Sequence, residues 1–356
     1  TLDPYIQRVA DNSMKAGIKD LEKWNRSARK LQGAMVITGT ENGEVLGFIN
    51  GNDSHYAGFN RPLNAQRQIG SLVKVAIYLA ALEDSRSYSL MTTLDDSPFQ
   101  WVDKHSGEVW KPQNYDFRSH GRVPLYDALQ NSYNLATVRL GMKLGLNKIQ
   151  STLKRLGIER EFKIYPSTLL GSLSLTPFEV AQMYQTIAGG GFRVPLRSIR
   201  EVLTHEGKPL QRYALSVEQR FDPSPIFLLN YALQRAVRYG TGRNVARKFP
   251  ENMILAGKTG TSNDLRDSWF TGFDSDLLAV TWLGRDDNKP IGLSGGTGAM
   301  HIWGRFIETV QPQSLAPVTP NRIQWRWVDP NLRVPFIIGN TTEINAAVNE
   351  QNKQWY

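Results

Sequence analysis

The sequence predicts an α+β domain with a mainly antiparallel sheet flanked by helices. Three observations indicate this class: two alternating apolar runs joined by Asn-Gly near the start of the chain, helical patterns through its middle, and three consecutive strand-like segments near its end. Grouped strands and grouped helices are typical of an α+β domain, because strands that alternate with helices would build a parallel sheet. We therefore expect one sheet that takes strands from both ends of the chain.

The first third of the chain contains a helix, a hairpin and a second helix. Residues 1–30 read as an opening turn followed by an amphipathic helix, and the apolar runs from Gly33 onward are joined by ENGE, which favours a hairpin. The run IGSLVKVAIYLAAL, residues 69–82, predicts an apolar helix directly behind a glycine. The polar stretch from Leu94 to Pro124 is too long for a simple turn, and loops of this length are usually functional or structured without regular elements.

The middle of the chain predicts helices over 125–156, 176–189 and 223–238. The second of these opens with a capping-box pattern and closes at three glycines. MILAGKTGTS, DSWFTGFDSD and LLAVTWLGRD then predict three strands, and GAMHIWGRFIETV predicts a closing helix. After Gln311 the chain is Pro-rich and then irregular, with Trp325, Trp327 and Trp355 expected to anchor it by packing.

The composition limits the class of protein and its partners. The 356 residues suffice for a large core, with 40% hydrophobic and 21% charged residues. The net charge of +9 would favour anionic partners, but the basic residues are spread along the chain, so we expect no nucleic-acid binding. The absence of cysteine excludes disulfides and thiolate metal sites. No apolar stretch of the sequence is long enough to span a membrane.

The histidines do not predict a metal site. They have no metal-ligand spacing, so we expect all five to be structural or surface residues: His55, His105, His120, His205 and His301. We expect neither a metal nor a cofactor. Trp269 and Phe270 are likewise interpreted as core aromatics rather than as substrate contacts.

The pair Ser71 and Lys74 is the first candidate for chemistry. Positions three apart on a helix share a face, so the Lys74 amine can reach the Ser71 hydroxyl. A lysine whose pKa is depressed by burial and by a second cation can take the proton of a serine and so make it a nucleophile. The spacing alone is a weak signal, because a serine and a lysine three apart are common on helices.

Two further motifs accompany this pair. LQNSYNLATVRLG places Ser132 and Asn134 two apart at the start of a helix, and AGKTGTSND places Lys258–Thr261 on a strand. Taken singly, the former fits an ordinary helix cap and the latter an edge strand with a glycine bulge. The order SxxK, SxN, KTG along one chain is, however, the motif set of β-lactamases and penicillin-binding proteins.

The chain resembles the transpeptidase domain of class A penicillin-binding proteins, of the 1b type, over roughly residues 31–312. Other family-like stretches are AGFNRPLNAQRQIGS, WKPQNYD, STLLGSLSLTPFEVAQMYQTIAGGG, RYGTGRN and DSWFTGF. The resemblance implies a β-lactamase/transpeptidase-like fold, with an all-helical lobe beside the sheet and the active site between them. It also implies that residues 1–30 are a connector remnant from a missing glycosyltransferase domain and that residues 313–356 are a C-terminal tail.

The resemblance also implies the roles of the motif residues. Ser71 would attack the carbonyl of the penultimate D-Ala of a peptidoglycan stem peptide and release the terminal D-Ala. Lys74 would be the base of acylation. Ser132, held between Lys74 and Lys258, would relay a proton to the leaving amine. Asn134 would orient Lys74 and the substrate amide.

The strand motif is implied to bind the substrate. Thr259 and Thr261 share one face of a strand, so their hydroxyls could bind the terminal carboxylate, with Lys258 adding charge. Gly260 would remove a side chain that obstructs an acyl donor lying along the strand. The backbone N–H groups of Ser71 and Thr261 would form the oxyanion hole.

The resemblance predicts acyl transfer rather than rapid hydrolysis. β-Lactamases of class A carry an ExxLN motif that activates water, but no acid lies from Phe162 to Pro177, and Glu159 and Glu161 lack that context. We therefore expect penicillin to acylate Ser71 and to leave slowly. A DD-carboxypeptidase, and a penicillin-acylated sensor without transfer activity, remain alternatives.

The expected partners are peptidoglycan stem peptides, as D-Ala-D-Ala donor and amine acceptor, and β-lactam antibiotics. The parent protein is expected at the periplasmic side of the bacterial inner membrane, held by an anchor absent from this sequence and bound by regulators of cell-wall synthesis.

Overall fold

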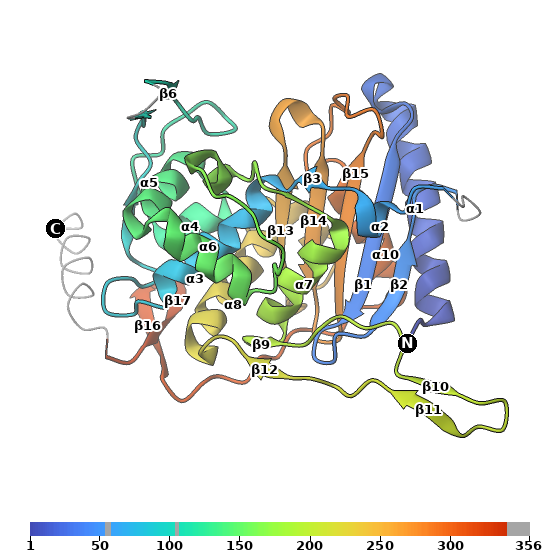
Figure 1. Ribbon diagram of the computed structural model, residues 1–356. Helices are drawn as coiled ribbons and strands as arrows, with labels where there is room; N and C mark the ends of the chain where they lie inside the picture. The colour runs from blue at the N-terminus through green and yellow to red at the C-terminus, as the bar shows by residue number, and fades with distance from the viewer. Residues whose placement is uncertain (54–57, 104–106, 340–356) are drawn as a thin grey trace.

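The computed structural model describes residues 1–53, 58–103 and 107–339, and its centre is a five-stranded sheet with the strand order β13-β14-β15-β1-β2 (Figure 1). The strands are β1 (Gln32–Gly39), β2 (Val45–Ile49), β13 (Ala256–Thr261), β14 (Ser268–Phe273) and β15 (Leu277–Gly284). All neighbours pair antiparallel, and β1 pairs with β15. The two ends of the chain therefore meet in one sheet, which confirms the predicted class and the predicted hairpin.

Helices cover both faces of this sheet (Figure 1). The α-helices of the described residues are α1 (Pro4–Trp24), α2 (Arg61–Asn64), α3 (Lys74–Leu82), α4 (Leu125–Gln130), α5 (Asn134–Leu144), α6 (Leu146–Arg155), α7 (Pro177–Ala188), α8 (Pro223–Arg238), α9 (Arg243–Ala246) and α10 (Ala299–Val310). The 3-10 helices are η1 (Arg26–Ala28), η2 (Gly70–Val73), η3 (Pro166–Leu170) and η4 (Asn263–Leu265).

Shorter strands form pairs outside the central sheet. The pairs are β3 (Arg67–Gln68) with β8 (Ser174–Leu175), β4 (Thr93–Asp95) with β7 (Arg122–Pro124), β5 (Trp101–Val102) with β6 (Val109–Trp110), β9 (Phe192–Arg193) with β12 (Glu218–Gln219), β10 (Glu201–Leu203) with β11 (Pro209–Arg212), and β16 (Ile323–Asp329) with β17 (Leu332–Ile337).

Alternating side chains divide the sheet into two apolar faces. Ala34 and Val36 of β1 belong to the core shared with the helical lobe, whereas Met35 and Ile37 belong to the core shared with α1 and α10. This division follows from the period of two along a strand. The domain consequently has three layers, and the segment expected to be a connector remnant contributes α1 to one of them.

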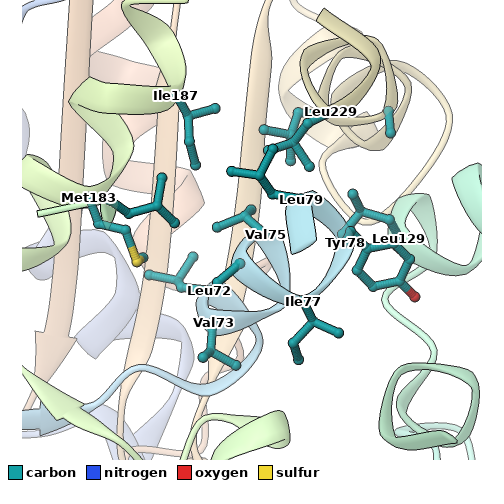
Figure 2. Close-up of a cluster of buried hydrophobic side chains, with 14 of the residues drawn as sticks. Leu72, Val73, Val75, Ile77, Tyr78, Leu79, Leu129, Met183, Ile187 and Leu229 are labelled. Atoms are coloured by element: carbon teal, nitrogen blue, oxygen red, sulfur yellow. The ribbon is translucent and has the colours of Figure 1, made fainter. Parts of the chain in front are cut away.

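Helix α3 lies at the centre of the helical lobe. Its nine residues are all buried, and it contacts α4, α5, α6 and α8. Figure 2 shows its apolar side chains surrounded by neighbours from other helices, such as Leu129, Ile187 and Leu229. A helix that is apolar all round is typical of a core position. Lys74, its only charged residue, is thus fixed at the first position of a fully packed helix.

The helical patterns are confirmed with one difference. α7 begins at the predicted capping box, in which the side chains of Thr176 and Glu179 each accept a hydrogen bond from the other residue's backbone N–H. The 125–156 pattern, however, contains three helices. Ser132 has a φ of +61° and Gly145 a φ of +90°, and these left-handed residues interrupt it.

The tail differs from the prediction of an irregular segment. Residues 323–337 form the β16–β17 hairpin against α8. Trp325 makes edge contacts with Phe227 and Tyr231, which confirms it as a packing anchor. Trp327 is 67% exposed, so the same prediction was wrong for it; it lies where the pairing of the two strands shifts register, between Trp327 and Asp329. Trp355 lies outside the described residues.

Candidate active site

Ser71 lies in the 3-10 turn η2, which touches the strand β13. Gly70 has a φ of +52°, and a Cβ on it would lie 2.2 Å from the carbonyl oxygen and 2.8 Å from the nitrogen of Thr261. Real Cβ atoms do not approach this closely, so glycine is required here. The backbones beside Ser71 and Thr261 are therefore in contact.

The Lys74 amine is held by the loop that carries Ser132. Lys74 Nζ donates hydrogen bonds to the carbonyl oxygen of Ser132 at 2.7 Å and to Asn134 Oδ1 at 2.6 Å. The carbonyl oxygen of Tyr133 and Ser132 Oγ each lie 3.3 Å from the same nitrogen. Among the described residues, the hydrogen bonds of Lys74 Nζ all go to this loop and none goes to Ser71 Oγ. Asn134 is thus one of the residues that hold the Lys74 amine in place.

A second amine reaches the same hydroxyl. Lys258 is 1% exposed on β13, and its Nζ lies 2.9 Å from Ser132 Oγ and 3.1 Å from the carbonyl oxygen of Thr259. Lys74 is fully buried on the other side of this hydroxyl. The structure therefore places the Ser132 hydroxyl between two buried amines from elements far apart in the sequence.

Burial changes the protonation chemistry of both lysines. It lowers the pKa of Lys74 well below its ordinary value, and the nearby charge of Lys258 lowers it further, while the buried carboxylate Asp96 opposes the shift. Burial also lowers the pKa of Lys258 to about 7. A neutral amine, which can accept a proton, is consequently accessible at pH values where an exposed lysine would be charged.

We expect Lys258→Met to reduce the pH dependence of folding stability. The pKa of Lys258 is about 7 in the folded protein and 10.5 for an ordinary lysine, so between these values the unfolded chain binds the extra proton. The free energy of unfolding of the unmodified protein therefore rises with pH across this window. The variant should show a shallower rise in urea titrations at pH 7 and pH 10. Equal slopes in both proteins would contradict the assignment.

The KTG strand presents two threonine hydroxyls on one side. Thr259 Oγ1 donates to Thr241 Oγ1 at 2.9 Å, and Thr261 Oγ1 accepts from the backbone N–H of Gly295 at 2.9 Å. The interpretation of Gly260 needs correction. A Cβ on Gly260 would lie 2.5 Å from the carbonyl oxygen of Ile69, inside the protein, so this glycine allows β13 to pack on the Ser71 turn. It does not clear space for an acyl donor.

The sequence interpretation missed the residues that hold the start of α5. Asn114 Oδ1 accepts from the backbone N–H of Asn134 at 2.6 Å, and Asp96 Oδ1 accepts from that of Ala136 at 2.9 Å. Asp96 Oδ2 in turn accepts from Asn114 Nδ2 at 2.6 Å and lies 2.9 Å from His120 Nδ1. These residues cap the helix from a distance, since its own N-cap residue supplies no side-chain bond. The available signal was the long polar loop 94–124 with its WKPQNYD stretch.

His120 is structural, as expected, and its ring stacks on that of Tyr133 with centroids 3.9 Å apart. His205 is exposed and His301 is half-buried, whereas His55 and His105 lie outside the described residues. No group of acidic or histidine side chains within the described ranges could hold a metal ion.

The two aromatic residues beyond the KTG strand are core residues. Trp269 and Phe270 have no exposed surface, and Trp269 Nε1 donates to the carbonyl oxygen of Gln68 at 2.9 Å. This confirms their interpretation as packing residues. Over the part of the chain that the structure describes, we find no helix with the length and apolar character needed to cross a membrane.

The site and the fold define a serine acyl-transfer protein, and comparison with known families agrees. The family described as the penicillin binding protein transpeptidase domain matches residues 33–283. The chain belongs to this family. The resemblance to the 1b type is confirmed too: penicillin-binding protein 1B of Vibrio cholerae is 43% identical over 324 residues, and that of Escherichia coli 41% over 332 residues.

These matches cover most of this chain but less than half of each relative. They span 91% of the chain and 41% of the Vibrio cholerae protein, and 92% of the chain and 39% of the Escherichia coli protein. Among solved structures, penicillin-binding protein 1A from Haemophilus influenzae matches with a TM-score of 0.80 and 25% identity over 87% of this chain and 54% of that one. PonA1 from Mycobacterium tuberculosis in complex with penicillin V matches with a TM-score of 0.73 and 21% identity over 90% and 86%. The predicted transpeptidase-like fold is thereby confirmed.

Proposed function

We propose that the chain is a serine DD-transpeptidase that crosslinks peptidoglycan stem peptides through an acyl-enzyme on Ser71. The observation that carries the proposal is the position of the Ser132 hydroxyl, 3.3 Å from Lys74 Nζ and 2.9 Å from Lys258 Nζ. A hydroxyl that can exchange protons with two amines of lowered pKa is suited to general acid–base catalysis. Membership of the transpeptidase family supports the reaction class.

In acylation, Ser71 gives its hydroxyl proton to neutral Lys74 and its oxygen bonds to the carbonyl carbon of the penultimate D-Ala. The backbone N–H groups of Ser71 and Thr261 stabilise the oxyanion, and one such donor is worth ~10²–10³ in rate. The peptide C–N bond then breaks. Ser132 passes a proton from Lys74 to the leaving nitrogen, with the charge of Lys258 beside it, so D-Ala leaves as a neutral amine.

In the second half-reaction, an amine of a neighbouring stem peptide attacks the ester carbonyl. The amine loses a proton through Ser132, a new amide bond forms, and Ser71 recovers its proton as the ester bond breaks. The second peptide needs space beside the acyl group.

The surroundings favour transfer over rapid hydrolysis. The segment 162–177 contains no acidic residue. The two nearest acidic residues before it form ion pairs at the surface, Glu159 with Arg193 and Glu161 with Lys154. Neither of these carboxylates is therefore available as a base that activates water at an acyl group on Ser71.

We expect the protein to join a donor ending in D-Ala-D-Ala to an amine-bearing acceptor peptide. Mass spectrometry of the products should show the crosslinked peptide and released D-Ala, both lost in Ser71→Ala. Trimmed donor without crosslinked product would contradict transfer and favour a DD-carboxypeptidase. A penicillin adduct without either product would favour a sensor.

The chain matches 41% and 39% of the length of the two curated relatives named above. We propose a bifunctional parent with a glycosyltransferase domain, in which residues 1–30 form the connector, 31–312 the transpeptidase domain and 313–356 a tail. The parent would be anchored in the inner membrane, face the periplasm and bind regulators of cell-wall synthesis. β-Lactams would act on it as substrate-like acylating agents.

A further inference from the structure

A buried acidic side chain outside the three motifs lies near the candidate site. Asp96 follows β4, at the start of the long polar loop, and has no exposed surface. Removing a carboxyl group from water is costly unless neighbouring groups form hydrogen bonds with it. The groups that bind Asp96 therefore indicate what its buried position does for the protein.

Both oxygens of Asp96 are bound, and one of them binds the helix that begins at Asn134. Asp96 Oδ1 accepts from the backbone N–H of Ala136, in the first turn of α5, at 2.9 Å. Asp96 Oδ2 accepts from Asn114 Nδ2 at 2.6 Å and from the backbone N–H of His120 at 3.0 Å. The first N–H groups of a helix carry partial positive charge, so an acidic side chain stabilises this end. Asp96 thereby fixes the first turn of α5 to the polar loop.

Asn114 links Asp96 to Asn134. The amide nitrogen of Asn114 donates to Asp96 and to the carbonyl oxygen of Arg118, so its amide oxygen points to α5. There this oxygen accepts from the backbone N–H of Asn134 at 2.6 Å. Asn134 Oδ1 accepts in turn from Lys74 Nζ at 2.6 Å. Consecutive hydrogen bonds thus connect the buried carboxylate to the amine that is the proposed base.

The charge of Asp96 acts on Lys74 against that of Lys258. Burial and the positive charge of Lys258 lower the pKa of Lys74, whereas the negative charge of Asp96 raises it. Charged side chains on the helices around α3 are engaged with other groups: Asp127 with Asn131, Arg139 with Asp95, Arg155 with Glu83 and Arg235 with Gln130. Lys74 therefore lies between a cation on β13 and an anion in the polar loop.

We propose that Asp96 is a positioning residue for acylation: it holds Asn134 against Lys74, and its negative charge supports the Lys74 amine as the proton acceptor. The inference rests on the proposed function and deepens it. Without this anion, burial and the charge of Lys258 would leave Lys74 a weaker base. A weaker base takes the proton of the nucleophile more slowly. The long polar loop thus belongs to the site, although none of its side chains needs to touch the substrate.

The test measures the rate of Ser71 acylation by penicillin as a function of pH. The acid limb of this profile reports the loss of a proton from Lys74 in the free protein. In Asp96→Asn the midpoint of this limb should fall by about half a pH unit or more, less than the one to three units that a directly adjacent charge produces. The plateau rate should fall about tenfold to hundredfold, since Asn134 and Lys74 are held less well.

Three further variants separate the effect of charge from that of position. Lys258→Met removes the opposing cation and should move the midpoint to a higher pH. Asn114→Ala keeps the charge of Asp96 but breaks the link to α5, so it should lower the plateau rate without lowering the midpoint. Asp95→Asn is the matched control: it removes the same charge from the preceding, exposed residue and should change neither value.

A titratable side chain next to Asp96 needs its own control. The ring of His120 lies between Asp96 and Asp116, with its nitrogens 2.9 Å and 3.1 Å from their carboxylate oxygens. The shift caused by Asp96→Asn is therefore measured in the His120→Gln background as well, where it should persist.

Circular dichroism shows whether each variant is folded. For a folded Asp96→Asn protein, the inference would be overturned by an unchanged or higher midpoint, by a shift that is absent in the His120→Gln background, or by an equal shift in Asp95→Asn. If Asp96→Asn does not fold, Asn114→Ala decides, and an unchanged plateau rate overturns the inference. An unmodified protein that penicillin does not acylate would instead contradict the proposed function.

Discussion

Lys74→Met is expected to slow acylation of Ser71 by penicillin by at least ~10²–10⁴-fold, the contribution of a positioned proton acceptor. The reason is that Lys74 is the one amine within the described residues that is both buried on the Ser71 helix and bonded to Ser132 and Asn134. Methionine keeps the length and apolar character of the side chain inside the core and removes only the amine. Labelling with fluorescent penicillin over time measures the rate.

The control for this variant is Lys148→Met, which removes an exposed amine from the neighbouring helix α6. It should label at the rate of the unmodified protein. Circular dichroism and the unfolding midpoint should show that the Lys74→Met protein is folded. A folded Lys74→Met protein that labels at the ordinary rate would contradict the role of Lys74 as base.

Ser132→Ala and Ser132→Gly are both expected to lose acylation by ~10²–10⁴-fold, because neither has a hydroxyl to pass a proton between Lys74 and the leaving nitrogen. The two variants differ in stability. Ser132 has a φ of +61°, a conformation that alanine adopts at a cost of roughly 1–2 kcal/mol and that glycine adopts freely. The glycine variant should therefore unfold at a higher temperature than the alanine variant while labelling equally slowly.

These two variants distinguish a loss of labelling caused by the missing hydroxyl from one caused by backbone strain. If the loss came from a displaced loop rather than from the missing hydroxyl, relief of the backbone strain in Ser132→Gly would restore labelling, and that result would contradict the relay. Ser151→Ala, an exposed serine on α6, is the control and should label at the ordinary rate.

The sequence predicted correctly the helices and strands that depend on residues close together in the chain. The Asn-Gly hairpin, the capping box at Thr176 and the three consecutive strands are encoded by neighbouring residues, and each lies where it was expected. The motif order predicted which residues meet, and Lys74, Ser132 and Lys258 do meet around one hydroxyl. What the motifs could not show was the burial of both lysines, which depends on the packing of α3 and on the sheet.

The remaining differences have tertiary causes. The 125–156 pattern does not show its second break, at Gly145, and the left-handed φ of Ser132 belongs to a loop whose carbonyl oxygens bind Lys74, far away in the sequence. The caps of α5 come from Asp96 and Asn114, many residues earlier, so no local rule identifies them. Gly260 was misinterpreted because a strand pattern does not tell which backbone lies opposite its missing side chain.

Two buried amines and one shared hydroxyl are proposed to make Ser71 a nucleophile for acyl transfer. Penicillin labelling followed by peptide mapping in a mass spectrometer tests this most directly. A single adduct is expected on Ser71, absent in Ser71→Ala, and it should persist over many minutes because Glu159 and Glu161 are held in ion pairs on the surface and do not activate water beside it. An adduct on a different serine, or penicillin turned over many times per second, would contradict it.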